Sequence, residues 1–485
     1  MGLLGILLGL ALLVGLAFRG WSVLVLTPAA ALLAAAFSGE PLLAHWTQTF
    51  MSAAARFVAQ FFPLFLLGAI FGKLMDDSGS VTAIARWMTG RLGVRRAMLS
   101  VVLAGALVTY GGVNMFVAFF VLVPMAGAMF RDAGIPNRLI PGAVALGTST
   151  FTMSALPGTP AVQNAIPMPF FGTTPFAAPG LGVLASAAML GFGLWWLGRA
   201  EAAARRAGEG YGLAPPPTGR DVADDPVLRE RAVASREFDP AETRRGRHGE
   251  AEPPFALAAL PLAVVIAVNL ALSLVVLPRL DTSFLAEPRW GPTSIVEVGG
   301  LWSVLVALAA GIVALILVNR RDRLPSIRET VDAGANASAL PILGVASLVG
   351  FGSVVAALPA FGLVREWVLG IGGGPLVSLA VAVNVLAALT GSASGGMTIA
   401  LDALGPTYVA LAAERGLDPG LMHRVAVMAA GTLDALPHNG AVVTLLAVCG
   451  ATHREAYGHI AMVSIVGALL ALALVVALGG LVGSF

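Results

Sequence analysis

The sequence predicts an all-α polytopic membrane protein built from two related halves of opposite orientation, each with one re-entrant helical hairpin and one broken helix. The first observation behind this prediction is composition. Of 485 residues, 57% are hydrophobic and only 12% are charged, and the mean hydropathy is +0.86. Soluble domains carry about a quarter charged residues, so a chain of this composition belongs in a bilayer. The other two observations are a duplicated segment and an uneven placement of arginines.

The duplicated segment occurs once in each half of the chain. Residues Thr152–Val162 and Thr432–Val442 agree at six of eleven positions and lie 280 positions apart. In both copies a proline beside small and polar residues interrupts an apolar run, which then resumes. Lipid cannot hydrogen-bond the backbone groups that such an interruption frees, so the break must be buried in protein or line a cavity. Matching broken helices in two halves of a membrane protein point to the binding site of a transporter.

The chain divides into a first membrane repeat, residues 1–198, and a second, residues 255–485. Between them, residues 199–254 contain three consecutive prolines, ten arginines and eleven acidic residues. Such a segment buries too little apolar surface to fold, so we expect a disordered linker. The apolar runs of each half follow one order: three spans, a hairpin, a broken helix and one more span. The N-terminal run lacks a preceding positive charge and a clear cleavage site, and we expect it to be retained as a span.

The expected hairpins lie in the apolar runs 97–130 and 375–412. Glycine-rich polar patches, Thr109–Asn114 and Thr390–Gly396, interrupt the two runs near their middles. A hairpin that enters and leaves the membrane on one side would have its tip at such a patch. Two full crossings joined by a short loop fit the hydropathy equally well.

The placement of basic residues favours the hairpins. If the hairpins do not cross, each half crosses the membrane five times, and an odd number inverts the second half relative to the first. Sixteen basic residues, including Arg199, Arg205 and Arg206 at the start of the linker but none of its later arginines, then lie on one side and five on the other. The five are Arg279, Arg289, Arg365, Arg415 and Arg424. By the positive-inside rule the crowded side and the linker are cytoplasmic, and both termini face outward across a bacterial inner membrane.

The second broken segment carries the ionisable candidates. Asp434, His438 and Asn439 surround Pro437, and ionisable groups at membrane depth are candidates for function. Asp434 and His438 are four residues apart, so they could share a proton if the helix persists. The alternative is a structural pair that ties the kink to a neighbouring helix.

Uncharged candidates lie in the first break and at the hairpin tips. The first break contains no titratable group, and its hydroxyls suit either ligand binding or helix packing. A helix begins directly after each tip, and its free N–H groups form a potential anion site. Because no arginine or lysine falls in a tip or break, we expect backbone dipoles and amides to hold a carboxylate. The candidates are Ser154 and Thr159 in the break and Thr109, Asn114, Thr390, Ser392 and Ser394 at the tips.

The chain resembles the gluconate permease family at Thr390–Gly396, at Leu436–Val442 and at Gly68–Leu74 with its turn Ser78-Gly79. The resemblance covers nearly the whole membrane portion but not the linker. It implies the inverted-repeat scaffold of the ion transporter superfamily, with tips and unwound helices around the substrate. It also implies a homodimer in which a transport domain moves like an elevator against a scaffold, and transport of gluconate or similar hydroxylated carboxylates, generally with protons.

Carried across residue by residue, the resemblance implies a site in two parts. One part is Thr390, Ser392, Ser394, Asp434, His438 and Asn439; opposite it lie Thr109, Asn114, Ser154 and Thr159. The first break, Ala155–Pro160, departs from the family, which has a proline- and histidine-containing turn there. We therefore expect a related sugar acid or short hydroxy acid as readily as gluconate itself.

Three functions are compatible with these sequence features. The first is a symporter of a small organic anion driven by protons, and the second couples to sodium, which hydroxyls and unwound carbonyls also suit. The third is a cation/proton antiporter, which the shortage of intramembrane acids disfavours. Motifs of metalloproteases, serine hydrolases and nucleotide-binding proteins are absent, so no enzyme activity is expected. We expect no cofactor, metal site or nucleic-acid partner; lipid surrounds the chain, and its single cysteine cannot form an intrachain disulfide.

Overall fold

In a computed structural model, the protein is all-α over its described residues, 1–17, 19, 21–212, 239, 242, 245–246, 249, 252–319, 323–437 and 439–485. Within these ranges eight helices are long and apolar enough to cross a membrane. They are Leu42–Asp77, Met115–Ala133, Pro179–Arg206, Phe255–Arg279, Ile295–Val318, Ile327–Ala357, Ala393–Arg415 and His453–Val482. The chain is therefore a multi-pass membrane protein, as its composition predicts.

The two halves have the same order of elements. The first half contains α1 (Gly2–Ala17), α2 (Val23–Phe37), α3 (Leu42–Ala44), α4 (Met51–Asp77), α5 (Ser80–Leu92), α6 (Ala97–Tyr110), α7 (Met115–Ala133), α8 (Ile140–Thr148), α9 (Phe151–Ser154), α10 (Val162–Ala165), α11 (Pro167–Phe171) and α12 (Pro179–Arg206). The second contains α15 (Phe255–Ala271), α16 (Ile295–Val318), α17 (Ile327–Ala357), α18 (Phe361–Leu369), α19 (Pro375–Thr390), α20 (Ala393–Arg415), α21 (Pro419–Ala430), α22 (Gly440–Cys449), α23 (Gly458–Ile460) and α24 (Gly467–Val482).

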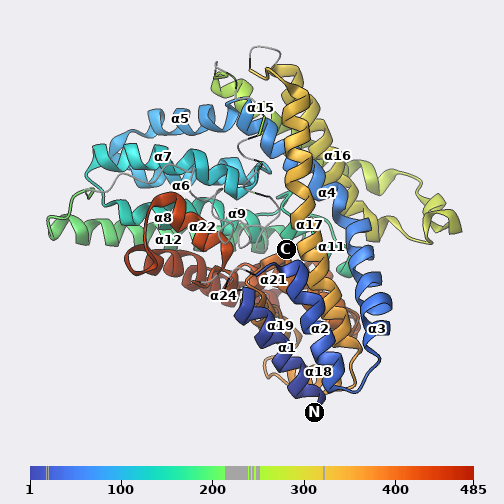
Figure 1. The fold of residues 1–485 in the computed structure, drawn as a ribbon. Helices are drawn as coiled ribbons and strands as arrows, with labels where there is room; N and C mark the ends of the chain where they lie inside the picture. The colour runs from blue at the N-terminus through green and yellow to red at the C-terminus, as the bar shows by residue number, and fades with distance from the viewer. Residues whose placement is uncertain are drawn as a thin grey trace.

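α4 and α17, which the sequence predicts as the third spans of the two halves, pack side by side along most of their length (Figure 1). Two other predicted spans, α1 and α2, have only 16 and 15 residues and are shorter than the eight helices that could cross a membrane. α4 and α17 run antiparallel, because Gly334 lies against Ile70 near one end and Gly350 lies against Phe50 near the other. A Cβ atom on Gly334 would come within 2.7 Å of the Ile70 Cα, so this position requires glycine for close backbone approach.

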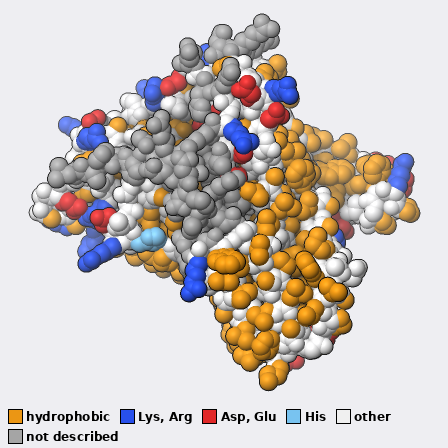
Figure 2. All heavy atoms as spheres, in the orientation of Figure 1, with side chains coloured by type: hydrophobic (Ala, Val, Ile, Leu, Met, Phe, Trp, Pro, Cys, Tyr) orange, Lys and Arg blue, Asp and Glu red, His pale blue; other side chains and the backbone are white. Residues whose placement is uncertain are grey.

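The outer surface is apolar over the part of the molecule that α1, α2 and α18 form. Figure 2 shows hydrophobic side chains covering this lobe and the adjoining flank, whereas charged side chains gather mainly at the opposite edge. Exposed leucines, valines and tryptophans on these helices include Leu7, Val25 and Trp367. An apolar patch of this extent fits contact with lipid.

A buried ion pair joins the end of α4 to the start of α17. Lys73, the only lysine of the chain, is fully buried, and its Nζ lies 2.8 Å from Asp77 Oδ1 and 3.7 Å from Asp76 Oδ2. Thr330 on α17 donates a 2.6 Å hydrogen bond to Asp77 Oδ2. This network crosses between the two halves and fixes one end of the α4–α17 pair.

The polar segment after residue 198 begins with ordered structure. α12 continues to Arg206 and so includes the first eight residues of the predicted linker, because an alanine-rich stretch with a Glu201–Arg205 pair favours helix. Beyond it, Arg138 donates to both Glu209 carboxylate oxygens at 2.7 and 2.8 Å, and Tyr211 O accepts from the Asn137 backbone N–H. Residues 199–212 of the predicted linker are therefore described, and most of its remainder lies outside the described residues.

We expect Asp77→Asn to destabilise the protein by about 3–5 kcal/mol, because it leaves a buried ammonium group without its closest carboxylate. The double variant Lys73→Met, Asp77→Asn should recover most of this loss, since it removes both charges and keeps an acceptor for Thr330. Thermal unfolding in detergent measures both changes. Equal stability of the single variant and the wild type would contradict the assigned role.

Glu209 provides a pH-dependent test of the contact with α12. The two hydrogen bonds from Arg138 hold the pKa of the Glu209 carboxyl below its ordinary value of 4.5. A lowered pKa contributes stability above the ordinary value, and this contribution disappears as the pH falls through the folded-state pKa. We expect Glu209→Gln to lower the melting temperature at neutral pH and to have no effect well below pH 4.5. Glu201→Gln, which removes an exposed pair within one helix, is the control and should change less.

Candidate functional site

The first break comprises residues 149–161, where α8 ends and only the single turn of α9 intervenes before α10. Three consecutive carbonyl groups that the break frees each accept a hydrogen bond from a side chain. Tyr110 Oη donates to Pro157 O at 2.8 Å, and Asn269 Nδ2 donates to Gly158 O at 2.9 Å. Asn164 Nδ2 donates to Thr159 O at 3.0 Å. The donors come from α6, α15 and α10, so three elements satisfy one break, as a lipid environment requires.

The first tip, residues 109–114, lies directly beside the first break. Thr109 Oγ1 donates to Gly105 O at 2.8 Å and lies 3.2 Å from Thr152 Oγ1 of α9. Asn114 caps α7, because its Oδ1 accepts from the Phe116 N–H at 2.9 Å. Gly112 has a φ of +98°, a conformation that glycine adopts without strain.

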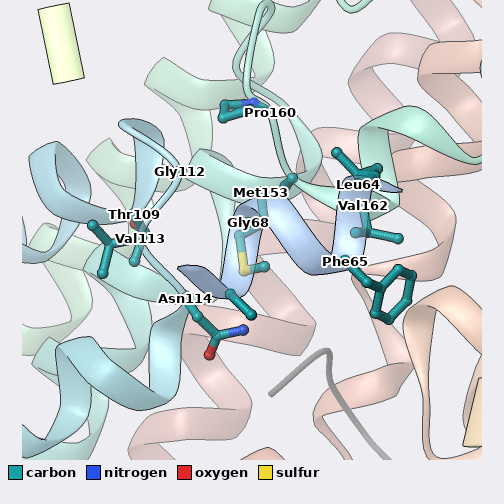
Figure 3. A pocket seen from close by; sticks show the side chains of 12 residues that line it. Leu64, Phe65, Gly68, Thr109, Gly112, Val113, Asn114, Met153, Pro160 and Val162 are labelled. Carbon is teal, nitrogen blue, oxygen red and sulfur yellow. The ribbon is translucent and has the colours of Figure 1, made fainter. Parts of the chain in front are cut away.

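The first cavity lies between this tip, the first break and α4 (Figure 3). Its polar lining comes from Thr109 and Asn114, and the rest is apolar. The lining residues are Leu64, Phe65, Gly68, Ala69, Thr109, Gly112, Val113, Asn114, Met153, Pro160, Ala161 and Val162. A volume of about 50 Å³ has room for a few water molecules.

Two first-half candidates are placed outside this cavity. Ser154 Oγ donates to Thr150 O at 3.1 Å, and Thr159 Oγ1 accepts from the Ala161 N–H at 3.4 Å. Both side chains therefore have partners within the break, and neither is among the residues that line the first cavity.

The second break comprises residues 431–439, and its two arms, Pro419–Ala435 and Gly440–Cys449, meet at 52°. Side chains again reach the freed carbonyls. His453 Nε2 donates to Pro437 O at 2.8 Å, and Tyr457 Oη donates to Ala435 O at 3.2 Å. In both breaks, side chains thus donate hydrogen bonds to the freed backbone carbonyl groups, although these donors occupy unrelated positions in the sequence.

The second tip, residues 390–396, is tied to the second break. Asn439 caps α22 through a 2.7 Å bond from the Ala441 N–H, and its Nδ2 donates to Gly391 O at 2.6 Å. A second link joins Thr432 to Asn384 on α19. The predicted proximity of tip and break is therefore observed in both halves.

Hydroxyl groups of the second tip bond mainly within the tip. Ser392 caps α20 by accepting from the Gly395 N–H at 3.1 Å, and Ser394 Oγ lies 3.3 Å from Ser392 Oγ. Thr390 Oγ1 donates to Leu386 O at 2.8 Å. Both serines are fully buried.

A second, smaller cavity adjoins Asp434, whose side chain is only 1% exposed. Asn439, Ser149 and Ser464 contribute the other polar groups, and a volume of about 20 Å³ has room for one water molecule. His438 lies outside the described residues, and so does the predicted Asp434–His438 pair. In the part of the chain that the structure describes, no group of three or more His, Cys, Asp or Glu side chains could hold a metal ion.

The two breaks meet at two places. Ser149 on the loop after α8 lines the second cavity beside Asp434. On the other side, a Cβ atom on Gly431 would lie 3.0 Å from the Ser154 Cβ. The polar groups of the two halves therefore form one contiguous region inside the protein.

Arg424 on α21 belongs to this region, although the positive-inside rule predicts it at the outward-facing surface. Its guanidinium is fully buried and donates to Ala177 O at 2.7 Å and to Ser154 O at 3.4 Å. The neighbouring His423 Nε2 lies 3.2 Å from Asn164 Oδ1. Its position in the sequence could have indicated burial, because Arg424 lies near the start of the apolar run that the second break interrupts.

Comparison with known proteins identifies relatives of this chain. A family model described as GntP family permease matches residues 1–169. An uncharacterized transporter of Bacillus subtilis (strain 168), YxjC, is 39% identical over 490 residues, which cover 99% of this chain and all of that protein. The high-affinity gluconate transporter of Escherichia coli (strain K12) is 38% identical over 104 residues, 21% of this chain and 23% of that protein.

The fold also resembles a solved transporter. The crystal structure of the Alcanivorax borkumensis YdaH transporter, described as having an unusual topology, matches with a TM-score of 0.52 and 17% identity. The match covers 90% of this chain and 89% of that one, and at this identity it concerns the fold alone.

The family to which these relatives belong consists of permeases rather than enzymes, in agreement with the sequence analysis. Full-length similarity to a transporter, together with the family match over the first tip and first break, assigns the chain. It is a membrane transporter and belongs to the GntP family of permeases.

Proposed function

We propose that this protein is a secondary active symporter that moves a small organic anion, such as gluconate or a related sugar acid or hydroxy acid, together with protons. The observation that carries the proposal is the meeting of two broken helices and two helix-capping tips in one buried polar region. Unwound segments at half depth suit alternating access better than a continuous pore. The similarity to a gluconate transporter supports the substrate class.

An inverted repeat organises the proposed carrier. The equal order of elements and the antiparallel α4–α17 pair both support two halves of opposite orientation. The first hairpin arms, α6 and α19, have 14 and 16 residues. At a rise of about 1.5 Å per residue they extend roughly 21 and 24 Å, less than the ~30 Å of a hydrocarbon core. The first arms are thus shorter than a full crossing, which supports re-entrant hairpins, whereas the second arms, α7 and α20, are long enough to cross.

The substrate carboxylate binds, in this proposal, at the first tip. The α7 N-terminus directs free N–H groups and partial positive charge toward the first cavity, where Thr109 and Asn114 add polar atoms. A cavity of about 50 Å³ is too small for a six-carbon acid, so the substrate enters only when the tip moves relative to α4. An elevator-like displacement of tips and breaks along α4 and α17 would provide that opening.

The coupling proton binds, in this proposal, to Asp434. Its carboxyl is buried at the second break, beside the Asn439 cap that holds the second tip. Protonation would remove a charge whose burial in lipid-depth surroundings is costly. A sodium ion is the alternative, because the Ser149 and Ser464 hydroxyls with the Asp434 carboxylate are hard oxygen ligands.

We expect proteoliposomes that contain this protein to accumulate radiolabelled gluconate when an inward proton gradient is imposed, and an uncoupler should abolish the accumulation. Asp434→Asn should lower the gradient-driven rate at least about tenfold, because an amide cannot bind the coupling proton. Gluconate exchange without a gradient should be affected less. Replacing sodium by choline tests the alternative: a wild-type rate that falls with sodium removal and ignores the proton gradient would refute proton coupling.

Asn114→Asp tests the first tip. Asp caps a helix as well as Asn does, so α7 should remain folded, but the new carboxylate faces the proposed anion site. We expect the KM for gluconate to rise at least about tenfold through charge repulsion, with little change in thermal stability. Ser326→Asp is the matched control, since Ser326 caps α17 away from both cavities. An unchanged KM in Asn114→Asp would exclude this tip as the carboxylate site.

A further inference from the structure

Arg424 is a buried charged residue to which the proposed function assigns no role. Its side chain is fully buried on α21. Nε and Nη2 donate to Ala177 O at 3.2 and 2.7 Å, and Nη1 donates to Ser154 O and to Asn164 Oδ1, each at 3.4 Å. All of these acceptors are neutral. Among the ion pairs that join described residues, none includes Arg424.

Neutral acceptors satisfy the guanidinium N–H groups but do not cancel its charge. An unpaired cation inside a low-dielectric protein is unfavourable, and its buried position persists only if the surroundings or a ligand compensate it. Arginine remains protonated under all conditions of interest, so it cannot lose the charge as a lysine or histidine can. The region around the breaks therefore carries a permanent positive charge that an arriving anion would offset.

The guanidinium contacts two residues that lie close along the chain to the lining of the first cavity. Ser154 directly follows Met153, and Asn164 lies two residues after Val162; Met153 and Val162 both line the cavity. Arg424 thus contacts both ends of the segment that separates it from the proposed anion site.

The other titratable groups at this place do not cancel the charge. Tyr110 on α6 donates to Pro157 O within the break, and His423 bonds to Thr173 and Asn164. Tyrosine is neutral at physiological pH and histidine carries no negative charge in either state, so neither offsets the guanidinium.

We propose that Arg424 is the counter-charge of the transported anion: a positioning residue that acts across the wall of the first break and makes the site prefer anions to neutral analogues of the same shape. The inference rests on the proposed function. It adds to the first tip, whose helix dipole and amide groups bind a carboxylate but discriminate less strongly against a neutral amide.

The test compares two probes of nearly equal shape, gluconate and its neutral amide gluconamide, in binding to the purified protein by calorimetry. We expect the wild type to bind gluconate at least about tenfold more tightly than gluconamide. Arg424→Gln should reduce this ratio to below about threefold, mainly by weakening gluconate. Arg424→Lys should retain most of the ratio, because it keeps the charge while losing the forked geometry. Arg415→Gln removes an exposed arginine at the end of α20 and should leave the ratio unchanged.

Each outcome decides one point. A folded Arg424→Gln variant with the wild-type ratio overturns the counter-charge. A ratio that falls in Arg424→Lys as far as in Arg424→Gln shows that the forked geometry, and not the charge, sets the preference, and this also overturns the counter-charge. If Arg424→Gln does not fold, the lysine variant decides alone: a retained ratio supports the proposal. If the wild-type protein binds gluconate and gluconamide equally, the counter-charge is overturned but gluconate transport is not. If it neither binds nor transports gluconate, the proposed function itself is refuted.

Discussion

The structure depends on one constraint: backbone groups freed by a broken helix inside a membrane must find partners within the protein. The first break meets it with Tyr110, Asn269 and Asn164, and the second with His453 and Tyr457. These five donors come from four separate elements, because His453 and Tyr457 lie in the same helical segment. Satisfying the breaks therefore also fastens the hairpins, the broken helices and α15 to one another, so the same bonds that make unwinding possible hold the polar region together.

Much of this arrangement follows from sequence patterns, because the patterns are local. Proline beside small polar residues located both breaks. Glycine-rich patches marked the α6–α7 and α19–α20 junctions, although α20 begins at Ala393, inside the second patch rather than after it. Order of elements followed from the apolar runs. The donors could not be foreseen, since Tyr110 and Asn269 lie 47 and 111 residues from the carbonyls they reach, and such pairings exist only after the chain has folded. The prediction that Arg424 lies at the outer surface was wrong for a related reason. The positive-inside rule assigns every basic residue to one of the two membrane surfaces, so it cannot predict an arginine buried inside the protein.

The two halves share a framework but differ in charge. The first cavity is lined by neutral groups, with a guanidinium behind its wall, whereas the second contains a buried carboxyl. Each half also supports the other, since α21 carries Arg424 to the first break while Ser149 reaches the second cavity. In the symporter proposed above, the first cavity would take the anion and the second the coupling cation, so each half would supply one of the two sites that coupled transport needs.

The continuous helical segment Leu42–Asp77 has 36 residues and packs against the 31-residue α17. At ~1.5 Å per residue it extends about 54 Å, well beyond the roughly 30 Å hydrocarbon thickness of a typical bilayer. Such a helix must lean away from the membrane normal or extend past the headgroups, and a thicker or thinner membrane alters that lean at a small energetic cost per ångström. Helices that line both cavities pack on this pair. The acyl-chain length of the surrounding phospholipids, which sets the bilayer thickness, should therefore influence the transport rate through the tilt of α4 and α17.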